Sequence, residues 1–125
     1  MVAALACKSA PIDSISSVKI GNDKDVSTEH SSFGPKDTIY VVTVLSNAGK
    51  AKVKGRVVVE DVAGANPGPI PGTEVTNELQ FANNVTFTYT PPTRGWPAGK
   101  YKVEVILMNE DGEQKDQKTV SFVVS

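Results

Sequence analysis

The chain contains few of the side chains that build catalytic and metal sites, with one cysteine and one histidine in 125 residues. A single cysteine excludes a disulfide within the chain and any zinc site that requires two thiolates. His30 has no second imidazole with which to bind a transition metal, so a site of that kind is not expected. No serine motif surrounds His30, so a nucleophile–base pair is not expected either. We therefore predict that the protein is not an enzyme, and we expect no cofactor and no bound metal.

Two polar turn segments contain clusters of oxygen ligands that could suit calcium, and neither has the spacing of an EF-hand. Side chains of this kind are usually solvated loop acids, which is the interpretation adopted for both segments. The residues are Asn22, Asp23, Asp25 and Glu29 in the first segment and Asn109, Asp111 and Glu113 in the second.

An excess of one charge is also lacking, because 13 basic residues oppose 14 acidic residues for a net charge of -1. Proteins that bind nucleic acids usually carry a basic stripe. The row Lys50, Lys52, Lys54 and Arg56 alternates along one expected strand, so we interpret it as a solvated strand face. With 39% hydrophobic and 22% charged residues, the composition is that of one globular domain. We expect no nucleic-acid partner.

What the sequence does contain is a recurrent strand signal, with apolar alternation about every dozen residues and no sustained helical period. Clusters of Gly, Asn, Asp and Pro separate the segments. This pattern predicts an all-β protein, an antiparallel β-sandwich of about seven strands. The expected strands are residues 15–20, 38–45, 51–62, 74–80, 85–90, 101–107 and 118–124, with 74–80 as a weak edge strand.

The connections are expected to differ between the two ends of the sandwich. Segments 46–49 and 109–112 are short and polar, and their composition is typical of tight hairpins with positive-φ residues. If successive strands are antiparallel, the longer segments 21–36, 63–73 and 91–98 all lie at the opposite end. Long loops on a rigid scaffold are common binding surfaces.

One segment gives a more specific fold signal, because Trp96, Pro97 and Gly99 precede Tyr101 at the start of an alternating strand. This arrangement resembles the tyrosine corner of immunoglobulin-like domains in bacterial exported proteins. The resemblance implies an immunoglobulin-like sandwich over residues 14–125, with Val103 where such domains usually place a cysteine. Domains of this kind usually serve as interaction or spacer modules.

The loop 91–97 contains the best candidate contacts for a partner, namely Pro92, Arg94 and Trp96 on a proline-stiffened backbone. Trp96 has two interpretations. Its ring either folds back over the core beneath Tyr101 or remains outside as an anchor for a ligand.

Residues 1–13 form an expected N-terminal tail, in which a short apolar run of small residues ends at Cys7. This segment resembles the end of a bacterial lipoprotein signal peptide, although Ala4 and Leu5 occupy positions where a branched and a small residue are usual. The resemblance implies a lipid on Cys7 and an extracytoplasmic domain whose only membrane contact is that lipid. The alternative is a tail with an incidental cysteine.

The leading functional hypothesis is a non-enzymatic protein-interaction or spacer module of a bacterial cell-envelope lipoprotein or secreted protein. Recognition would use the long-loop end or an exposed sheet edge. One alternative is a carbohydrate-binding module, for which Trp96, Phe33 and Tyr40 are the available aromatic side chains. The other is a protease inhibitor that acts through the long loops. The sequence does not indicate an oligomeric state.

Overall fold

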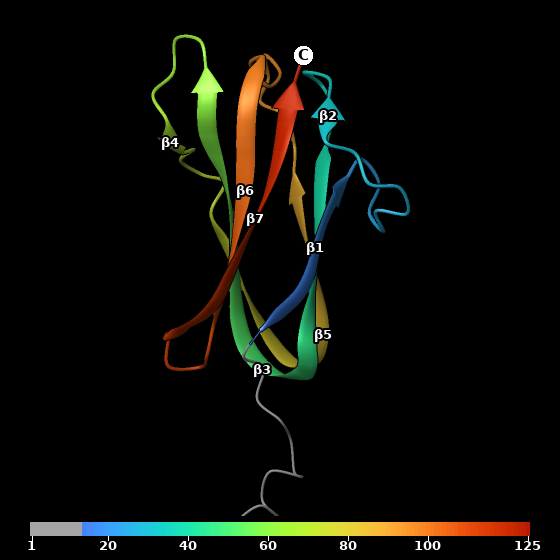
Figure 1. The fold of residues 1–125 in the computed structure, drawn as a ribbon, viewed down its shortest axis with the longest axis vertical. Coiled ribbons are helices and arrows are strands. Elements are labelled where there is room, and N and C mark those ends of the chain that lie inside the picture. The colour runs from blue at the N-terminus through green and yellow to red at the C-terminus, as the bar shows by residue number, and fades with distance from the viewer. Residues whose placement is uncertain (1–13) are drawn as a thin grey trace, which may run out of the picture.

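The computed structural model describes residues 14–125, and these residues form a single β-sandwich (Figure 1). The predicted tail and the predicted lipidation site, Cys7, lie outside the described residues. The strands are β1 (Ile15–Gly21), β2 (Ser32–Phe33), β3 (Ile39–Val62), β4 (Gly68–Pro69), β5 (Val75–Tyr89), β6 (Gly99–Met108) and β7 (Gln114–Val124). The fold class predicted from the sequence, an immunoglobulin-like sandwich of about seven strands, is confirmed.

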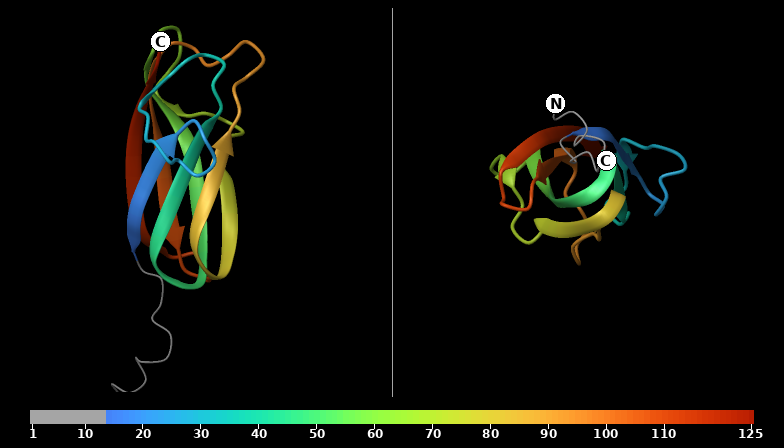
Figure 2. Two further views of the ribbon diagram at one scale, coloured as in Figure 1. Left: turned by 90° about the vertical axis from the view of Figure 1, so that its right-hand side faces the viewer. Right: turned by 90° about the horizontal axis from the view of Figure 1, so that it is seen from below.

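Two long, curved strands join the sheets of the sandwich. β3 descends in one sheet, bends at the lower end of Figure 1 and ascends in the other, and β5 pairs antiparallel with both of its halves. The first sheet contains β1, the first half of β3 and the second half of β5, which lie side by side in Figure 2. The second contains the other halves of β5 and β3, followed by β6 and β7.

The predicted hairpin at 46–49 is wrong, because this segment is part of the continuous 24-residue strand β3. The β3–β5 register shifts between Val44 and Gly49 and again between Gly49 and Ala51. Such irregularities bend a strand sharply without ending its ladder, so the chain turns the corner as a strand. For the same reason, the expected strands 74–80 and 85–90 are two halves of β5.

Two very short strands, β2 and β4, are not apparent from sequence alternation. β2 pairs parallel with the end of β7, at Ser32–Val123 and Phe33–Val124, so the expectation of purely antiparallel pairing is wrong at this point. β4 adds to β3 at Val58 and Val59. Their positions depend on the strands that they meet rather than on any local pattern.

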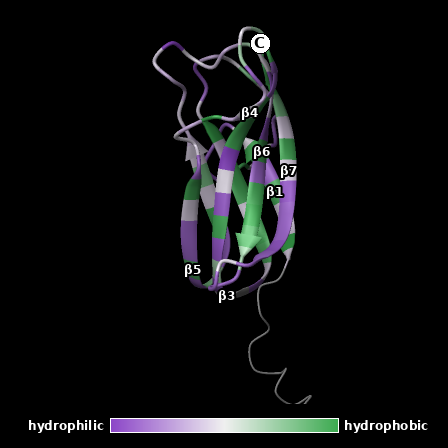
Figure 3. Ribbon diagram, turned by 90° about the vertical axis from the view of Figure 1, so that its left-hand side faces the viewer, coloured by the Kyte–Doolittle hydropathy of each residue, from purple (hydrophilic) through white to green (hydrophobic). Residues whose placement is uncertain are grey.

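The core follows the predicted alternation, which is visible as bands of opposite hydropathy along the strands (Figure 3). On β6, the inward residues Tyr101, Val103, Val105 and Leu107 are at most 1% exposed. The inward faces predicted for 85–90 and for the closing strand are also confirmed. The remaining large members include Ile39, Val41, Leu45, Val53, Val57, Phe87, Tyr89 and Phe122.

The tyrosine corner is present as the resemblance implied. The Tyr101 hydroxyl donates a hydrogen bond to the carbonyl oxygen of Pro97, four residues upstream. The Tyr101 ring stacks on Phe122 at 5.1 Å, and Trp96 meets it edge-on at 6.3 Å. Gly99 has a φ of 151°, and a Cβ there would lie 2.5 Å from the Asp61 carbonyl oxygen. The corner therefore requires glycine before the tyrosine strand.

Candidate interaction surfaces

The three long connections lie together at the upper end of the sandwich in Figure 1, which confirms the predicted asymmetry of the loops. At this end Pro92 and Arg94 are exposed. Lys36 ties the neighbouring loop to theirs, because its Nζ donates to the carbonyl oxygen of Thr93 at 2.8 Å. The two exposed residues remain predicted partner contacts.

Trp96 has to be removed from the predicted partner site. Its side chain is only 4% exposed, and its indole Nε1 donates to the carbonyl oxygen of Asp37 at 2.9 Å. The backbone N–H of Trp96 donates to the carbonyl oxygen of Pro35 at 2.7 Å. The indole therefore seals the core above Tyr101, and the interpretation in which it folds back is the correct one.

The aromatic residues considered for sugar binding are also unavailable as a platform. Phe33 is 3% exposed and packs edge-on against Phe122, and Trp96 is buried as described. Tyr40 is half-buried in β3. A carbohydrate site built from these three rings is therefore excluded.

The polar turn segments use their oxygen atoms to fold themselves. Asp23 Oδ2 accepts hydrogen bonds from the backbone N–H and the hydroxyl of Ser27, both at 3.2 Å. Asn109 Oδ1 accepts from the backbone N–H groups of Asp111 and Glu113 at 2.9 Å. Among residues 14–125, no three His, Cys, Asp or Glu side chains form a group that could hold a metal ion. The same residues contain no helix that is long and apolar enough to cross a membrane.

The outer edge of β5 is the most distinctive surface of the molecule. Within the described part of the chain, β5 pairs only with β3, so one side of its 15-residue backbone has no neighbouring strand. The edge position predicted for 74–80 is confirmed, and it continues to Tyr89. The sequence could not show this extension, because it depends on which strands become neighbours.

The composition of this edge differs from that of edges protected against pairing. Natural proteins usually protect a free edge with lysine, proline or very short strands. The β5 sequence VTNELQFANNVTFTY contains no proline or basic residue and has Glu78 as its single charge. Beside its second half, the outer face of the sheet carries half-buried Tyr40, Val42 and Val44. A partner strand would therefore meet an uncharged surface there.

A second unusual feature of β5 is Phe81, at the corner where the strand passes between sheets. Its side chain is 75% exposed, and its φ of 61° lies in the left-handed region. Phe81 has the same parity as Val85 and Phe87, so regular alternation would direct its ring into the core. The positive φ at the register shift turns the ring outward instead, and no local sequence signal indicates that reversal.

A shallow cleft with a volume of about 190 Å³ lies next to this corner. Lys50 connects the two features, because it lines the cleft and its Nζ lies 5.9 Å from the centroid of the Phe81 ring. The cleft is lined by Lys50, Ala51, Lys52, Glu78, Leu79, Gln80 and Glu110.

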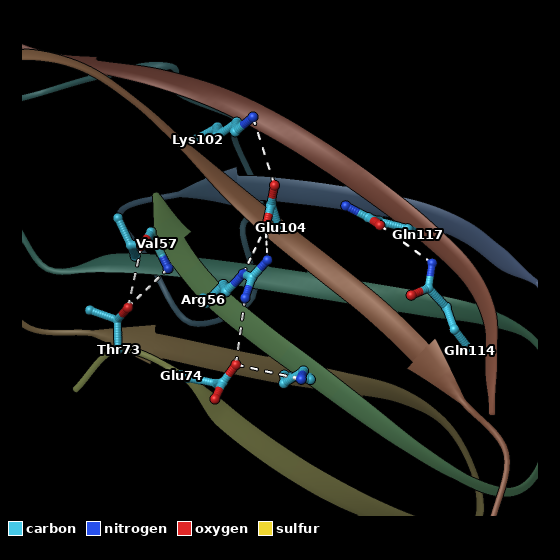
Figure 4. A network of polar contacts seen from close by, with 9 residues as sticks. Arg56, Val57, Thr73, Glu74, Lys102, Glu104, Gln114 and Gln117 are labelled. Carbon is cyan, nitrogen blue, oxygen red and sulfur yellow. Dashed lines mark hydrogen bonds and ion pairs between the residues drawn. The ribbon is translucent and has the colours of Figure 1, made fainter. Parts of the chain in front are cut away.

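Further up the same sheet, Lys54 and Arg56 of the predicted basic row form ion pairs with acidic side chains on neighbouring segments (Figure 4). Arg56 Nη2 lies 2.7 Å from Glu104 Oε1, and Glu74 Oε2 lies 3.5 Å from Lys54 Nζ. Lys102 approaches the other oxygen of Glu104 at 3.7 Å. This network supports the interpretation of the row as a solvated face. Lys50 and Lys52 form no such ion pair within the described residues.

Two hydroxyls are buried between the sheets without a hydrogen-bond partner among the described residues, namely those of Thr43 and Tyr89. Burial raises the pKa of the Tyr89 hydroxyl above its ordinary value, so this group is neutral at physiological pH. Its oxygen lies against Gly55, where an added Cβ would be 2.8 Å away. The glycine therefore gives the tyrosine the space that it occupies.

Comparison with known proteins supports the fold. No family model and no curated protein matches the chain. A Niemann-Pick type C2 protein from the Japanese carpenter ant matches at 19% identity and a TM-score of 0.52, covering 95% of this chain and 96% of that one. The PmoD soluble domain from Methylocystis matches at 13% identity and 0.52, over 86% and 89%. A superoxide reductase (neelaredoxin) from Ignicoccus hospitalis matches at 13% and 0.50, over 89% and 82%.

These similarities are below 25% identity, so they describe architecture and not activity. Together with the tyrosine corner, they place the chain in the class of small, all-β, immunoglobulin-like sandwich domains.

Proposed function

We propose that the protein is a non-enzymatic recognition module that binds an extended segment of another protein by strand addition to β5. The observation that carries this proposal is the free edge of β5, which has 15 residues, no proline and no basic side chain. In strand addition, the backbone N–H and C=O groups of an edge provide affinity, and alternate side chains provide specificity.

The second half of β5 is the best place for the added strand. Its inward residues Val85, Phe87 and Tyr89 are buried, so the backbone is held rigidly by the core. Its outward residues Thr86 and Thr88 are exposed and uncharged. A rigid edge with small polar side chains can accept a strand without large rearrangement, which lowers the entropic cost of binding.

The proposed setting is the extracytoplasmic side of a bacterial envelope, with the domain tethered through a lipid on Cys7. The support is the resemblance of the segment ending at Cys7 to a lipoprotein signal. Replacing Cys7 with serine in the source cell, or in a related bacterial host, should move the protein from the membrane fraction to the soluble envelope fraction. Unchanged fractionation would contradict lipid anchoring.

Strand addition can be tested by capture of binding partners from an envelope extract, with variants that introduce the same charge at different places. Thr86→Lys places a cation on the β5 edge, whereas Thr119→Lys makes the same change at an exposed position on β7. We expect the first variant to lose a specifically captured protein and the second to retain it. Backbone amides of β5 should also become protected from hydrogen exchange in the complex.

Arg94→Ala distinguishes the edge from the long-loop end. Loss of capture with Arg94→Ala and retention with Thr86→Lys would transfer recognition to the loops. Capture of no specific protein by the wild type would favour a spacer.

A further inference from the structure

Phe81 is the most exposed aromatic side chain in the described part of the chain. A positive φ is rare for a bulky residue and is strained. The fold nevertheless holds Phe81 at a φ of 61° and exposes its ring to solvent, although regular alternation along β5 would direct the ring inward. A strained backbone that exposes an apolar ring is a reason to look for a ligand beside it.

The adjoining cleft offers hydrogen-bond donors and acceptors in balance. Lys50 and Lys52 supply ammonium donors, while Glu78 and Glu110 supply carboxylate acceptors. Gln80 supplies one group of each kind. The formal charges of the four ionised side chains cancel, so the cleft favours neither an anion nor a cation.

Three elements contribute to this cleft. Lys50 and Lys52 come from the corner of β3, and Glu78 and Gln80 come from β5. Glu110 reaches it from the turn between β6 and β7. The polar groups are therefore held by paired strands and one short turn, which limits the reorganisation needed on binding.

We propose that the corner formed by Phe81 and this cleft is a binding subsite for a neutral saccharide unit. A sugar ring has an apolar C–H face, which suits the exposed Phe81 ring, and hydroxyl groups that both donate and accept hydrogen bonds. Lys50 links the two parts of the subsite, because its ammonium group lies over the ring and also lines the cleft. This inference is independent of strand addition, because the lysine variant Thr86→Lys leaves all of the residues of the corner in place.

The test uses three neutral trisaccharides, maltotriose, cellotriose and chitotriose, titrated to about 20 mM to detect millimolar dissociation constants. Binding is followed in ¹H–¹⁵N NMR spectra of the protein. We expect at least one trisaccharide to shift amide signals of Lys50, Lys52 and Glu110 together with those of residues 78–81. The amide signals of Thr93 and Arg94 in the long loop should not shift.

The key variant is Phe81→Gly, because glycine accepts the left-handed φ and the variant should fold at least as stably as the wild type. We expect its affinity for the bound trisaccharide to fall at least about tenfold, which corresponds to about 1.4 kcal/mol. Val75→Ala is the matched control, since it shortens another exposed apolar residue of β5, 43% exposed, outside the cleft. It should bind as the wild type does.

Three results would overturn the proposal. The first is the absence of specific shifts with all three trisaccharides, and the second is equal affinity of Phe81→Gly and the wild type. The third is tighter binding of trigalacturonate or spermidine than of any neutral sugar, because that would contradict the balance of charge. Thr86→Lys should bind the sugar as the wild type does. A failure of strand addition can therefore be distinguished from a failure of this subsite.

Discussion

Val103 lies at the centre of the β6 face that the sequence alternation identifies as inward, and its side chain is fully buried. Val103→Ala should lower the free energy of unfolding by about 1–3 kcal/mol through lost burial and a residual cavity. The control is the neighbouring Lys102→Ala, which removes only a surface ion pair with Glu104 and should be nearly neutral. Urea unfolding measures both, and equal midpoints would contradict the assigned core face.

Tyr101 combines two interactions in one side chain, stacking on Phe122 and the hydroxyl bond to Pro97. Tyr101→Phe keeps the ring and removes the hydroxyl, so we expect a loss of about 0.5–1.5 kcal/mol. Thermal or urea denaturation would detect it. An unchanged stability would mean that the corner depends on ring packing alone.

At the scale of the element, β3 and β5 show how far sequence patterns can predict this fold. Alternation predicts their inward faces, because Val53, Val57, Val85 and Phe87 must reach the same core. It does not predict that segment 46–49 continues as a strand. Serine, asparagine, alanine and glycine suit a tight turn and a bent strand equally well, and the difference is decided by the β5 register opposite them.

The candidate sites were less predictable than the fold, for a related reason. Arg94 and Pro92 are apparent from composition and are exposed in the structure, and their role as partner contacts stays a prediction. The free edge of β5 depends on which strands become neighbours, and the outward turn of Phe81 depends on a left-handed φ that its sequence does not favour. Neither property is encoded by a local pattern.

Packing between β3 and β5 also depends on Gly55, since a Cβ there would lie 2.8 Å from the Tyr89 hydroxyl and 3.0 Å from Phe87. Gly55→Ala should therefore lower stability by about 1–3 kcal/mol through overpacking. Tyr89→Phe should be neutral or slightly stabilising, because the hydroxyl that it removes is buried without a partner.

Combining the two substitutions tests their contact directly. In the Tyr89→Phe background, Gly55→Ala should cost less than in the wild type, because the closest atom is gone. Urea unfolding of the four proteins in this cycle gives the coupling free energy. If Gly55→Ala lowers the stability of the wild type and of Tyr89→Phe by the same amount, the added Cβ clashes with Phe87 rather than with the Tyr89 hydroxyl.

At the scale of the whole molecule, Asp116 connects the first and last long strands. Its Oδ2 accepts a hydrogen bond from the backbone N–H of Ile15 at 2.8 Å, and its Oδ1 accepts from Gln117 at 2.8 Å. The bond from Ile15 is the main reason that the pKa of the Asp116 carboxyl lies below its ordinary value. The carboxylate thereby joins β7 to β1 across the sandwich.

This interaction predicts a dependence of stability on pH. Because the native pKa is below the unfolded value of about 3.9, the stabilisation is complete above that pH and is lost as the pH falls through the native pKa. Asp116→Asn should lower the free energy of unfolding by about 1 kcal/mol at pH 7. Denaturation from pH 2 to pH 7 should show the two proteins converging at the acidic end, and a constant difference would contradict the linkage.

The opposite positions of the start of β1 and the end of β7 have a mechanical consequence (Figure 1). A force applied between residues 14 and 125 acts nearly along the strands, whereas their ladder hydrogen bonds are perpendicular to them. The ladders are then loaded in shear, and many bonds must break together rather than one after another. We therefore expect the domain to resist extension along its long axis.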